Sequence, residues 1–357
     1  MSKNNNLHNA KRAKQDEFYT QWSDIQDEMN AYLEYDPDVF RGKIVLLPCD
    51  DPGWSNFTKY FAEQFEYLGI KKLISTSYAP KANMDGAFYE AEETVIQAAH
   101  YDPALDYERG KIFVLDGTDL NSDGRVNKED FRWDYLQGDG DFRSAEVTAL
   151  RDEADMVITN PPFSLFREFM TWLNDGEVEF AVIGSMNAIT YKEIFPLIKD
   201  NKLWIGATGM KSITYEVPVV GDVGRSQFEE NGKRYQKMGN TCWFTNIQHG
   251  RRHEPLRLMS LKENRKYNKR IIKNPNSYKK YDNYDAIEVP FTSGIPNDYS
   301  DVMGVPISFL DKYCPEQIEI VGYMASTQIT EYNFGYPYVD GQKKYARILI
   351  RHINPET

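Results

Sequence analysis

The spacing of hydrophobic and polar residues predicts several amphipathic helices in the first 250 residues. Where apolar residues recur at intervals of three and four, one face of a helix is apolar and can pack against a core. Ser55 suits the N-cap of one such helix and Gly69 its C-terminal stop. The helices are expected over residues 15–36, 55–69, 86–100 and 166–176.

Short apolar runs between these helices predict β-strands. Strands that alternate with helices are typical of an α/β protein with a mostly parallel, doubly wound sheet. The strands are expected within residues 42–52, 71–79, 111–115, 156–158, 179–186, 202–209 and 240–247.

Two of these strands end in unusual polar sequences. Residues 49–52 read Cys-Asp-Asp-Pro after the first strand, and residues 159–163 read Thr-Asn-Pro-Pro-Phe after another. In a doubly wound sheet, ligands bind at the carboxyl ends of the strands, near the point where the strand order reverses. We therefore expect both segments to open toward the same crevice.

The stretch Asn160-Pro161-Pro162-Phe163 suits the binding of an aromatic amino group. Proline cannot donate to a strand ladder, so pairing should stop at Asn160. The fixed φ of proline directs the carbonyls of Asn160 and Pro161 the same way, beside the Asn160 side-chain oxygen. These acceptors can take both hydrogens of the amine and stabilise positive charge developing on its nitrogen, while Phe163 stacks on the ring. A simple Pro-Pro turn is the alternative.

The pattern changes after about residue 248, where the sequence becomes basic and rich in Tyr, Asn and Pro. Apolar runs at 302–310 and 318–324 indicate that this part is folded. We therefore expect one domain over residues 1–248 and a second region over residues 249–357. A chain of 357 residues is long enough for both.

The charge is unevenly distributed along the chain. A net charge of −12 argues against a nucleic-acid partner, yet residues 251–280 contain eleven Lys or Arg and only two acids. Distant acids are screened over a Debye length of about 8 Å, so a local basic surface can still contact phosphates. An ordinary solvated surface is the alternative. The residues expected to contact DNA are Arg251, Arg252, Arg265, Lys266, Lys269 and Arg270.

The remaining composition narrows the class of protein. There is no run of 18 apolar residues, and the segment MSKNNNLHNAKRAK is polar and basic. We expect no membrane span, no signal peptide and a cytoplasmic location. Cys49, Cys242 and Cys314 are far apart and odd in number, which argues against a disulfide framework or a Cys-rich zinc site.

Taken in order, four segments resemble those of the EcoRI-type adenine-specific DNA methyltransferase family: DEFYTQ at 16–21, CDDP at 49–52, GDGDFRS at 138–144 and NPPF at 160–163. Residues 239–247 and 304–313 are also similar to this family. The resemblance implies a Rossmann-like methyltransferase sheet, with the target-recognition region last. It also implies S-adenosylmethionine as cofactor.

The resemblance assigns roles to particular residues. The catalytic tetrapeptide would be Asn160, Pro161, Pro162 and Phe163. The cofactor would contact Phe18, Tyr19, Thr20, Asp50, Asp51, Pro52, Asp141, Phe142 and Asn160. Phe18, Asp141 and Phe142 could instead belong to a helix core and a turn. Ser55 and Phe57 stand where the family has glycines, and the segment ISTSYAP lacks the acid expected to bind the cofactor ribose.

Residues 119–130, DLNSDGRVNKED, have the oxygen-ligand spacing of a calcium loop. Its position 12 is Asp rather than Glu, as in dockerin modules. We expect a structural calcium ion here as an insertion in the first domain, with a polar surface loop as the alternative. The ligands would be Asp119, Asn121, Asp123, Arg125 through its carbonyl, Asn127 and Asp130.

The resulting hypothesis is an enzyme that transfers a methyl group to adenine N6 of a flipped base in duplex DNA. It implies a role in restriction-modification or phage and host DNA protection, with a restriction endonuclease of the same specificity as a possible partner. An RNA adenine methyltransferase would share the chemistry but act on single-stranded bases. A DNA-binding protein that has lost catalysis is the alternative of another class.

Overall fold

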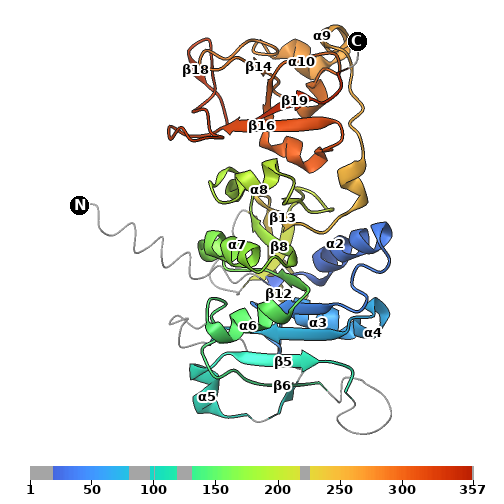
Figure 1. The fold of residues 1–357 in the computed structure, drawn as a ribbon, viewed down its shortest axis with the longest axis vertical. Coiled ribbons are helices and arrows are strands. Elements are labelled where there is room, and N and C mark those ends of the chain that lie inside the picture. The colour runs from blue at the N-terminus through green and yellow to red at the C-terminus, as the bar shows by residue number, and fades with distance from the viewer. Residues whose placement is uncertain (1–18, 80–96, 100, 119–130, 218–225, 356–357) are drawn as a thin grey trace, which may run out of the picture. The chain divides into compact units, whose positions relative to one another are not determined.

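The computed structural model describes residues 19–79, 97–99, 101–118, 131–217 and 226–355 (Figure 1). The chain divides into two compact units. The first unit comprises residues 1–186 and 211–247, and the second comprises residues 187–210 and 248–357. The second unit therefore contains an earlier segment, 187–210, as well as the C-terminal part of the chain.

The first unit is a mixed α/β structure. Its helices are α2 (Trp22–Tyr35), α3 (Asn56–Glu63), α4 (Phe65–Leu68), α5 (Pro103–Glu108), α6 (Ala145–Glu153), the 3-10 turn η2 (Phe163–Leu165) and α7 (Phe166–Asp175). Its strands are β1 (Tyr19–Thr20), β2 (Ile44–Leu47), β3 (Lys72–Thr76), β4 (Gln97–Ala98), β5 (Lys111–Leu115), β6 (Arg132–Tyr135), β7 (Met156–Thr159), β8 (Glu179–Ser185), β10 (Ile213–Val217), β11 (Gln227–Glu230), β12 (Lys233–Met238) and β13 (Thr241–Thr245).

A large mixed sheet forms the core of this unit. Eight of its strands run in the order β4-β6-β5-β3-β2-β7-β8-β13. The four central strands, β3, β2, β7 and β8, are parallel. Residues 45–47 and 156–158 have no exposed surface, as expected for central strands covered on both faces. Because β3 and β7 flank β2 on opposite sides, the strand order reverses at β2.

Several sequence predictions differ from this structure. The sheet is less parallel than expected, because β5 pairs antiparallel with β3, β6 with β5, and β13 with β8. The first helix begins only at Trp22, since Tyr19–Thr20 form strand β1 and pair with β10. Gln97–Ala98 form strand β4 instead of a helix end, paired with β6.

The helix expected over 55–69 forms as two pieces with the expected ends. The Ser55 hydroxyl accepts a hydrogen bond from Phe57 N and caps α3. The two pieces meet at Gln64. Gly69 ends α4 with a left-handed φ of 65°, a conformation that costs glycine little.

A smaller antiparallel sheet, β1-β10-β12-β11, completes the first unit. The apolar and polar positions of β10 alternate, with Ile213, Tyr215 and Val217 buried. This sheet was not expected from the sequence. Its strand β1 carries the two described residues of the DEFYTQ segment, and it thereby fixes their backbone by pairing.

The second unit is built on a four-stranded sheet in the order β14-β15-β19-β16. Its helical segments are η3 (Met186–Thr190, whose first residue belongs to the first unit), α8 (Phe195–Lys199), η4 (Gly250–His253), α9 (Leu261–Tyr267), α10 (Lys269–Lys273), η5 (Thr292–Gly294) and η6 (Ile307–Lys312). Its strands are β9 (Trp204–Ile205), β14 (Ile287–Glu288), β15 (Met303–Pro306), β16 (Ile318–Met324), β17 (Tyr338–Val339), β18 (Gln342–Lys343) and β19 (Arg347–His352). Only two residues of the strand expected over 202–209 are extended.

Candidate active site

The carboxyl ends of β2 and β7 meet in the first unit. The two strands are parallel neighbours, with Val45 opposite Met156 and Leu46 opposite Val157. Just beyond the paired residues, Thr159 Oγ1 donates a hydrogen bond of 2.5 Å to Asp50 Oδ2. Thr159 is fully buried and directly precedes Asn160. The acidic segment and the NPPF segment therefore lie together at the point where the strand order reverses.

The carboxyl of Asp50 lies inside the protein. Only 4% of the residue is exposed, and Ser55 Oγ donates to its Oδ1 at 2.7 Å. Burial raises its pKa from 3.8 to about 7, although the hydrogen bonds from Thr159 and Ser55 act in the opposite direction. Ser55, which stands where a glycine was expected, thus both caps α3 and holds this carboxyl.

The neighbouring Asp51 belongs to a different cluster. Its Oδ1 accepts a hydrogen bond of 2.7 Å from Gly53 N, and its Oδ2 lies 3.4 Å from Lys111 Nζ. Lys111 also lies 3.4 Å from Asp106 and 4.7 Å from the ring centre of Trp133. Burial lowers the pKa of Lys111, but the carboxylates of Asp51 and Asp106 outweigh it, and the pKa is raised.

The NPPF segment leaves β7 as an extended turn that leads into η2. Pro161 is buried, whereas Asn160 and Phe163 are partly exposed. Leu165 N donates to the Pro162 carbonyl at 3.0 Å. The carbonyl of Pro161 receives no such bond from the described residues. One carbonyl of the Pro-Pro pair is thus used to start η2, and the other remains able to accept a proton donor.

The DEFYTQ segment reaches this region through strand β1. Phe18, a predicted cofactor contact, lies outside the described residues, and for Tyr19 only the backbone is described. Asn56 Nδ2 of α3 donates to the Thr20 carbonyl at 2.8 Å. Thr20 is 3% exposed, and among the described residues its hydroxyl has no hydrogen-bond partner. β1 therefore brings an unused buried hydroxyl to the start of α3.

The GDGDFRS segment packs against the end of β3. Ala79 N donates to the Asp139 carbonyl at 2.8 Å, and Gly140 adopts a φ of 81°. A Cβ atom on Gly140 would lie 2.0 Å from the Ser77 carbonyl oxygen, so only glycine fits here. The segment therefore closes over the strand that follows α4.

The Asp141-Phe142 pair in this segment is held by its own neighbours. Arg143 donates to both carboxylate oxygens of Asp141 and thereby lowers the pKa of that carboxyl. Phe142 is 4% exposed, and its ring centre lies 5.0 Å from that of Phe169 and 5.6 Å from that of Trp172. In this structure Phe142 is part of an aromatic cluster.

Two of the six predicted DNA contacts have partners inside the second unit. Arg251 forms an ion pair of 2.7 Å with Asp311. Arg252 is 6% exposed, and its guanidinium lies 3.7 Å from the ring centre of Trp204. Burial lowers the pKa of Arg252. The sequence showed only the basic character of these two residues, because Trp204 and Asp311 are distant along the chain.

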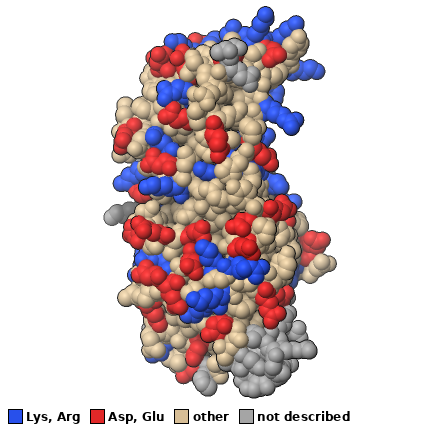
Figure 2. Space-filling view, turned by 45° about the vertical axis from the view of Figure 1, so that its right-hand side comes forward, with Lys and Arg blue, Asp and Glu red and all other residues tan. Residues whose placement is uncertain are grey.

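The other four predicted contacts lie on the helix pair α9 and α10 and are exposed: Arg265, Lys266, Lys269 and Arg270. A capping box between Ser260 and Glu263 starts α9, and the Asn268 side chain caps α10. Figure 1 places both helices at one end of the second unit, and Figure 2 shows Lys and Arg gathered at that end. The exposed Tyr267 and Ile272 accompany these charges.

The predicted calcium loop, residues 119–130, lies outside the described residues. Within the part of the chain that is described, no group of three or more His, Cys, Asp or Glu residues could hold a metal ion. No described helix is both long enough and apolar enough to cross a membrane.

Comparison with known proteins places the chain in a family. Residues 6–353 match the family model described as "Adenine-specific methyltransferase EcoRI". The chain is 40% identical over 349 residues to the Type II methyltransferase M.EcoRI of Escherichia coli, covering 97% of this chain and 96% of that protein. It is 32% identical over 357 residues to the Type II methyltransferase M.MpnI of Mycoplasma pneumoniae, covering 96% of each. No solved structure matches the chain. The chain therefore belongs to the EcoRI family of adenine-specific methyltransferases and is a DNA methyltransferase enzyme.

Proposed function

We propose that this enzyme methylates adenine N6 at one specific sequence in duplex DNA, with S-adenosylmethionine as the methyl donor. The observation that carries the proposal is the hydrogen bond between Thr159 and Asp50. It joins the candidate amine-binding segment to the acidic segment at the reversal of strand order, where a doubly wound sheet binds its ligands.

Several buried polar groups at these strand ends fit a polar cofactor. The unused hydroxyl of Thr20 is available to it, and the carboxyl groups of Asp50 and Asp51 lie one residue apart after β2. We assign cofactor contacts to these residues together with Tyr19 and Pro52. Phe18 and the Asp141-Phe142 pair stay in the proposal on the strength of the sequence motifs. When bound, the cofactor supplies an electrophilic methyl group on a positively charged sulfur.

The NPPF segment would orient the acceptor base. The Asn160 side chain and the Pro161 carbonyl accept the two hydrogens of the adenine amino group, and Phe163 stacks on the base. The structure supports this assignment because Pro162 uses its carbonyl within the turn whereas Pro161 does not. Such acceptors stabilise the positive charge that develops on nitrogen, so no strong base is required.

The amino group lies inside the double helix, so the target base must be flipped out of the stack. The exposed basic residues of α9 and α10 would hold phosphates, while other side chains of the region 249–357 read base edges. We place the biological role in restriction-modification or in phage and host DNA protection, with a nuclease of the same specificity as the partner.

Methylation of unmethylated genomic DNA tests the proposal. The full chain is incubated with labelled S-adenosylmethionine, and the DNA is digested to nucleosides and sequenced for modified bases. We expect N6-methyladenine confined to one short motif. Label in RNA alone, or no label together with no heat of cofactor binding, would refute the proposal in favour of an RNA enzyme or a non-catalytic DNA-binding protein.

The Asn160→Ala variant tests the catalytic assignment. Loss of an acceptor needed in the transition state should lower turnover by at least about 100-fold, while DNA affinity stays near that of the unaltered chain. Asn174→Ala, which changes an exposed asparagine at the end of α7, should retain full activity. If Asn160→Ala kept full activity, NPPF would not be the catalytic segment.

A further inference from the structure

Residues 336–345 form a β-hairpin that presents one tyrosine to solvent. β17 and β18 pair antiparallel, with Tyr338 opposite Lys343 and Val339 opposite Gln342. Tyr345 follows β18 and is 89% exposed, more than any other large hydrophobic side chain among the described residues. A ring this exposed contributes little to the core of its own chain, so its presence on a well-held hairpin calls for another reason.

The turn of the hairpin is fixed by side chains from elsewhere in the second unit. Asp340 and Gly341 adopt φ values of 50° and 73°, as in a tight two-residue hairpin turn. The Asp282 carboxylate accepts hydrogen bonds from Asp340 N at 3.1 Å and Gly341 N at 2.7 Å. Lys279 adds an ion pair of 2.6 Å to Asp340. The turn is therefore tied to residues at the end of the basic segment 251–280.

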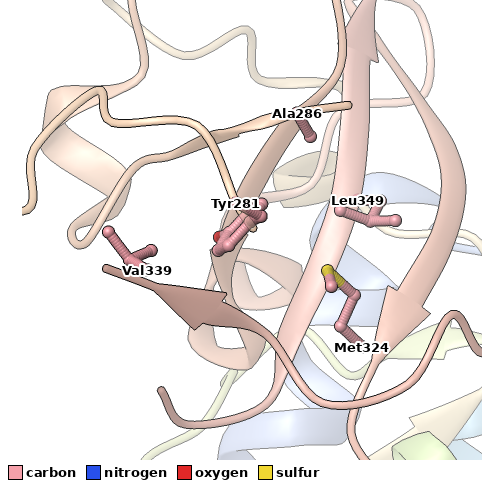
Figure 3. Close-up of a cluster of buried hydrophobic side chains, with 5 residues drawn as sticks. All are labelled: Tyr281, Ala286, Met324, Val339 and Leu349. Carbon is pink, nitrogen blue, oxygen red and sulfur yellow. The ribbon is translucent and has the colours of Figure 1, made fainter. Parts of the chain in front are cut away.

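One side chain of the hairpin is buried in a hydrophobic cluster (Figure 3). Val339 has no exposed surface and belongs to a cluster whose other buried members are Tyr281, Ala286, Met324 and Leu349. Figure 3 shows Val339 directed from the hairpin toward Tyr281. Because Val339 alternates with Tyr338 and Asp340 along the strand, its burial turns those neighbours outward.

The backbone after the hairpin is held by a buried arginine. Arg347 Nη1 donates to the carbonyls of Tyr345 at 3.2 Å and Ala346 at 3.1 Å. The guanidinium is itself fixed by Glu288, 2.5 Å from Nη2, and Tyr281 hydrogen-bonds the same carboxylate. The backbone of Tyr345 is thus held in place while its ring projects into solvent.

The residues beside this ring are basic. Lys343 Nζ lies 3.1 Å from the ring centre of Tyr336, and Lys344 Nζ donates to the Gln342 side chain at 3.2 Å. Neither lysine has an ion pair with an acidic side chain in the described part of the chain. Two uncompensated cations flanking an exposed aromatic ring match a polyanion that also offers apolar surface, and DNA is such a partner.

We propose that the 336–345 hairpin is a second DNA-contacting element, in which Lys343 and Lys344 neutralise phosphates and the ring of Tyr345 contacts bases of the recognition sequence. This inference rests on the proposed function, since it names a specificity-determining residue for the same duplex. Preorganisation supports it: a fixed backbone lets one exposed ring contact a base without an added ordering cost.

Two tyrosine variants separate base contact from phosphate contact. The probe is a fluorescent duplex carrying the motif that the genomic experiment identifies, compared with a scrambled duplex of equal composition. We expect Tyr345→Ala to weaken binding of the motif duplex about tenfold and binding of the scrambled duplex little. Tyr345→Phe should bind as the unaltered chain does. If removal of the hydroxyl alone weakened both duplexes equally, Tyr345 would contact phosphate and the base contact would be wrong.

The lysines should show the opposite signature. Changing Lys343 and Lys344 to Gln should weaken both duplexes by the same factor and reduce the salt dependence of binding by about one to two phosphate contacts, each worth a slope of about 0.9. Tyr67→Ala and Lys71→Gln are matched exposed controls in the first unit and should change nothing.

The two proposals fail in different ways. If the unaltered chain methylates no DNA, the proposed function fails. If it methylates and binds its motif but Tyr345→Ala matches it on both duplexes, only the role of the hairpin is refuted. If Tyr345→Ala changed the oligomeric state instead of DNA affinity, the hairpin would serve a second copy of the chain, which also overturns the inference.

Discussion

Replacement of Asp50 by Asn should change how the stability of the enzyme depends on pH. The Asp50 carboxyl is enclosed by protein and accepts hydrogen bonds from Ser55 and Thr159. Burial raises its pKa from 3.8 to about 7. Asparagine has nearly the same size and keeps an oxygen acceptor, but its side chain does not titrate.

The direction of the effect follows from the protons bound in each state. Between about pH 4 and pH 7 the folded chain keeps the proton on Asp50, whereas the unfolded chain has released it. Stability therefore falls as pH rises through this window and is level above it. A shift of about three pKa units corresponds to about 4 kcal/mol over the whole window. About 1 kcal/mol of this, or tenfold in the unfolding constant, is lost between about pH 6 and pH 8.

Urea unfolding at pH 6 and pH 8, followed by circular dichroism, measures this difference. The Asp50→Asn variant should lack about 1 kcal/mol of the pH dependence of the unaltered chain, and the comparison cancels the contribution of the histidines. Asp38→Asn removes a carboxylate that is 69% exposed and should behave as the unaltered chain. Identical pH dependence in the unaltered chain and the Asp50→Asn variant would show that burial does not hold the proton on Asp50.

Two further variants test how the structure is held together. Gly140→Ala forces a left-handed φ of 81° on alanine and drives its Cβ into the Ser77 carbonyl, so thermal unfolding should show a loss of at least about 2 kcal/mol; an unchanged melting temperature would contradict this contact. Arg347→Met leaves Glu288 buried without its cation and should cost about 3–5 kcal/mol in urea unfolding; a neutral effect would mean that the pair adds no net stability.

The sequence by itself determined much of the first unit and the chemistry of its site. Apolar runs located β2, β3, β7 and β8, because central parallel strands are buried on both faces and need continuous apolar residues. Ser55 and Gly69 marked the two ends of the helical segment through local hydrogen bonding and backbone freedom. The family followed from motifs that are local in the chain.

The tertiary structure decided what depends on partners distant in the sequence. The direction of β5 and β13, the pairing of Tyr19–Thr20 with β10 and the enclosure of Phe142 all arise from such contacts. The sequence equally could not separate the engaged Arg252 from the exposed Arg265, because a charge run carries no information about burial. The Thr159–Asp50 hydrogen bond joins residues 109 positions apart, and only packing of the sheet brings them together.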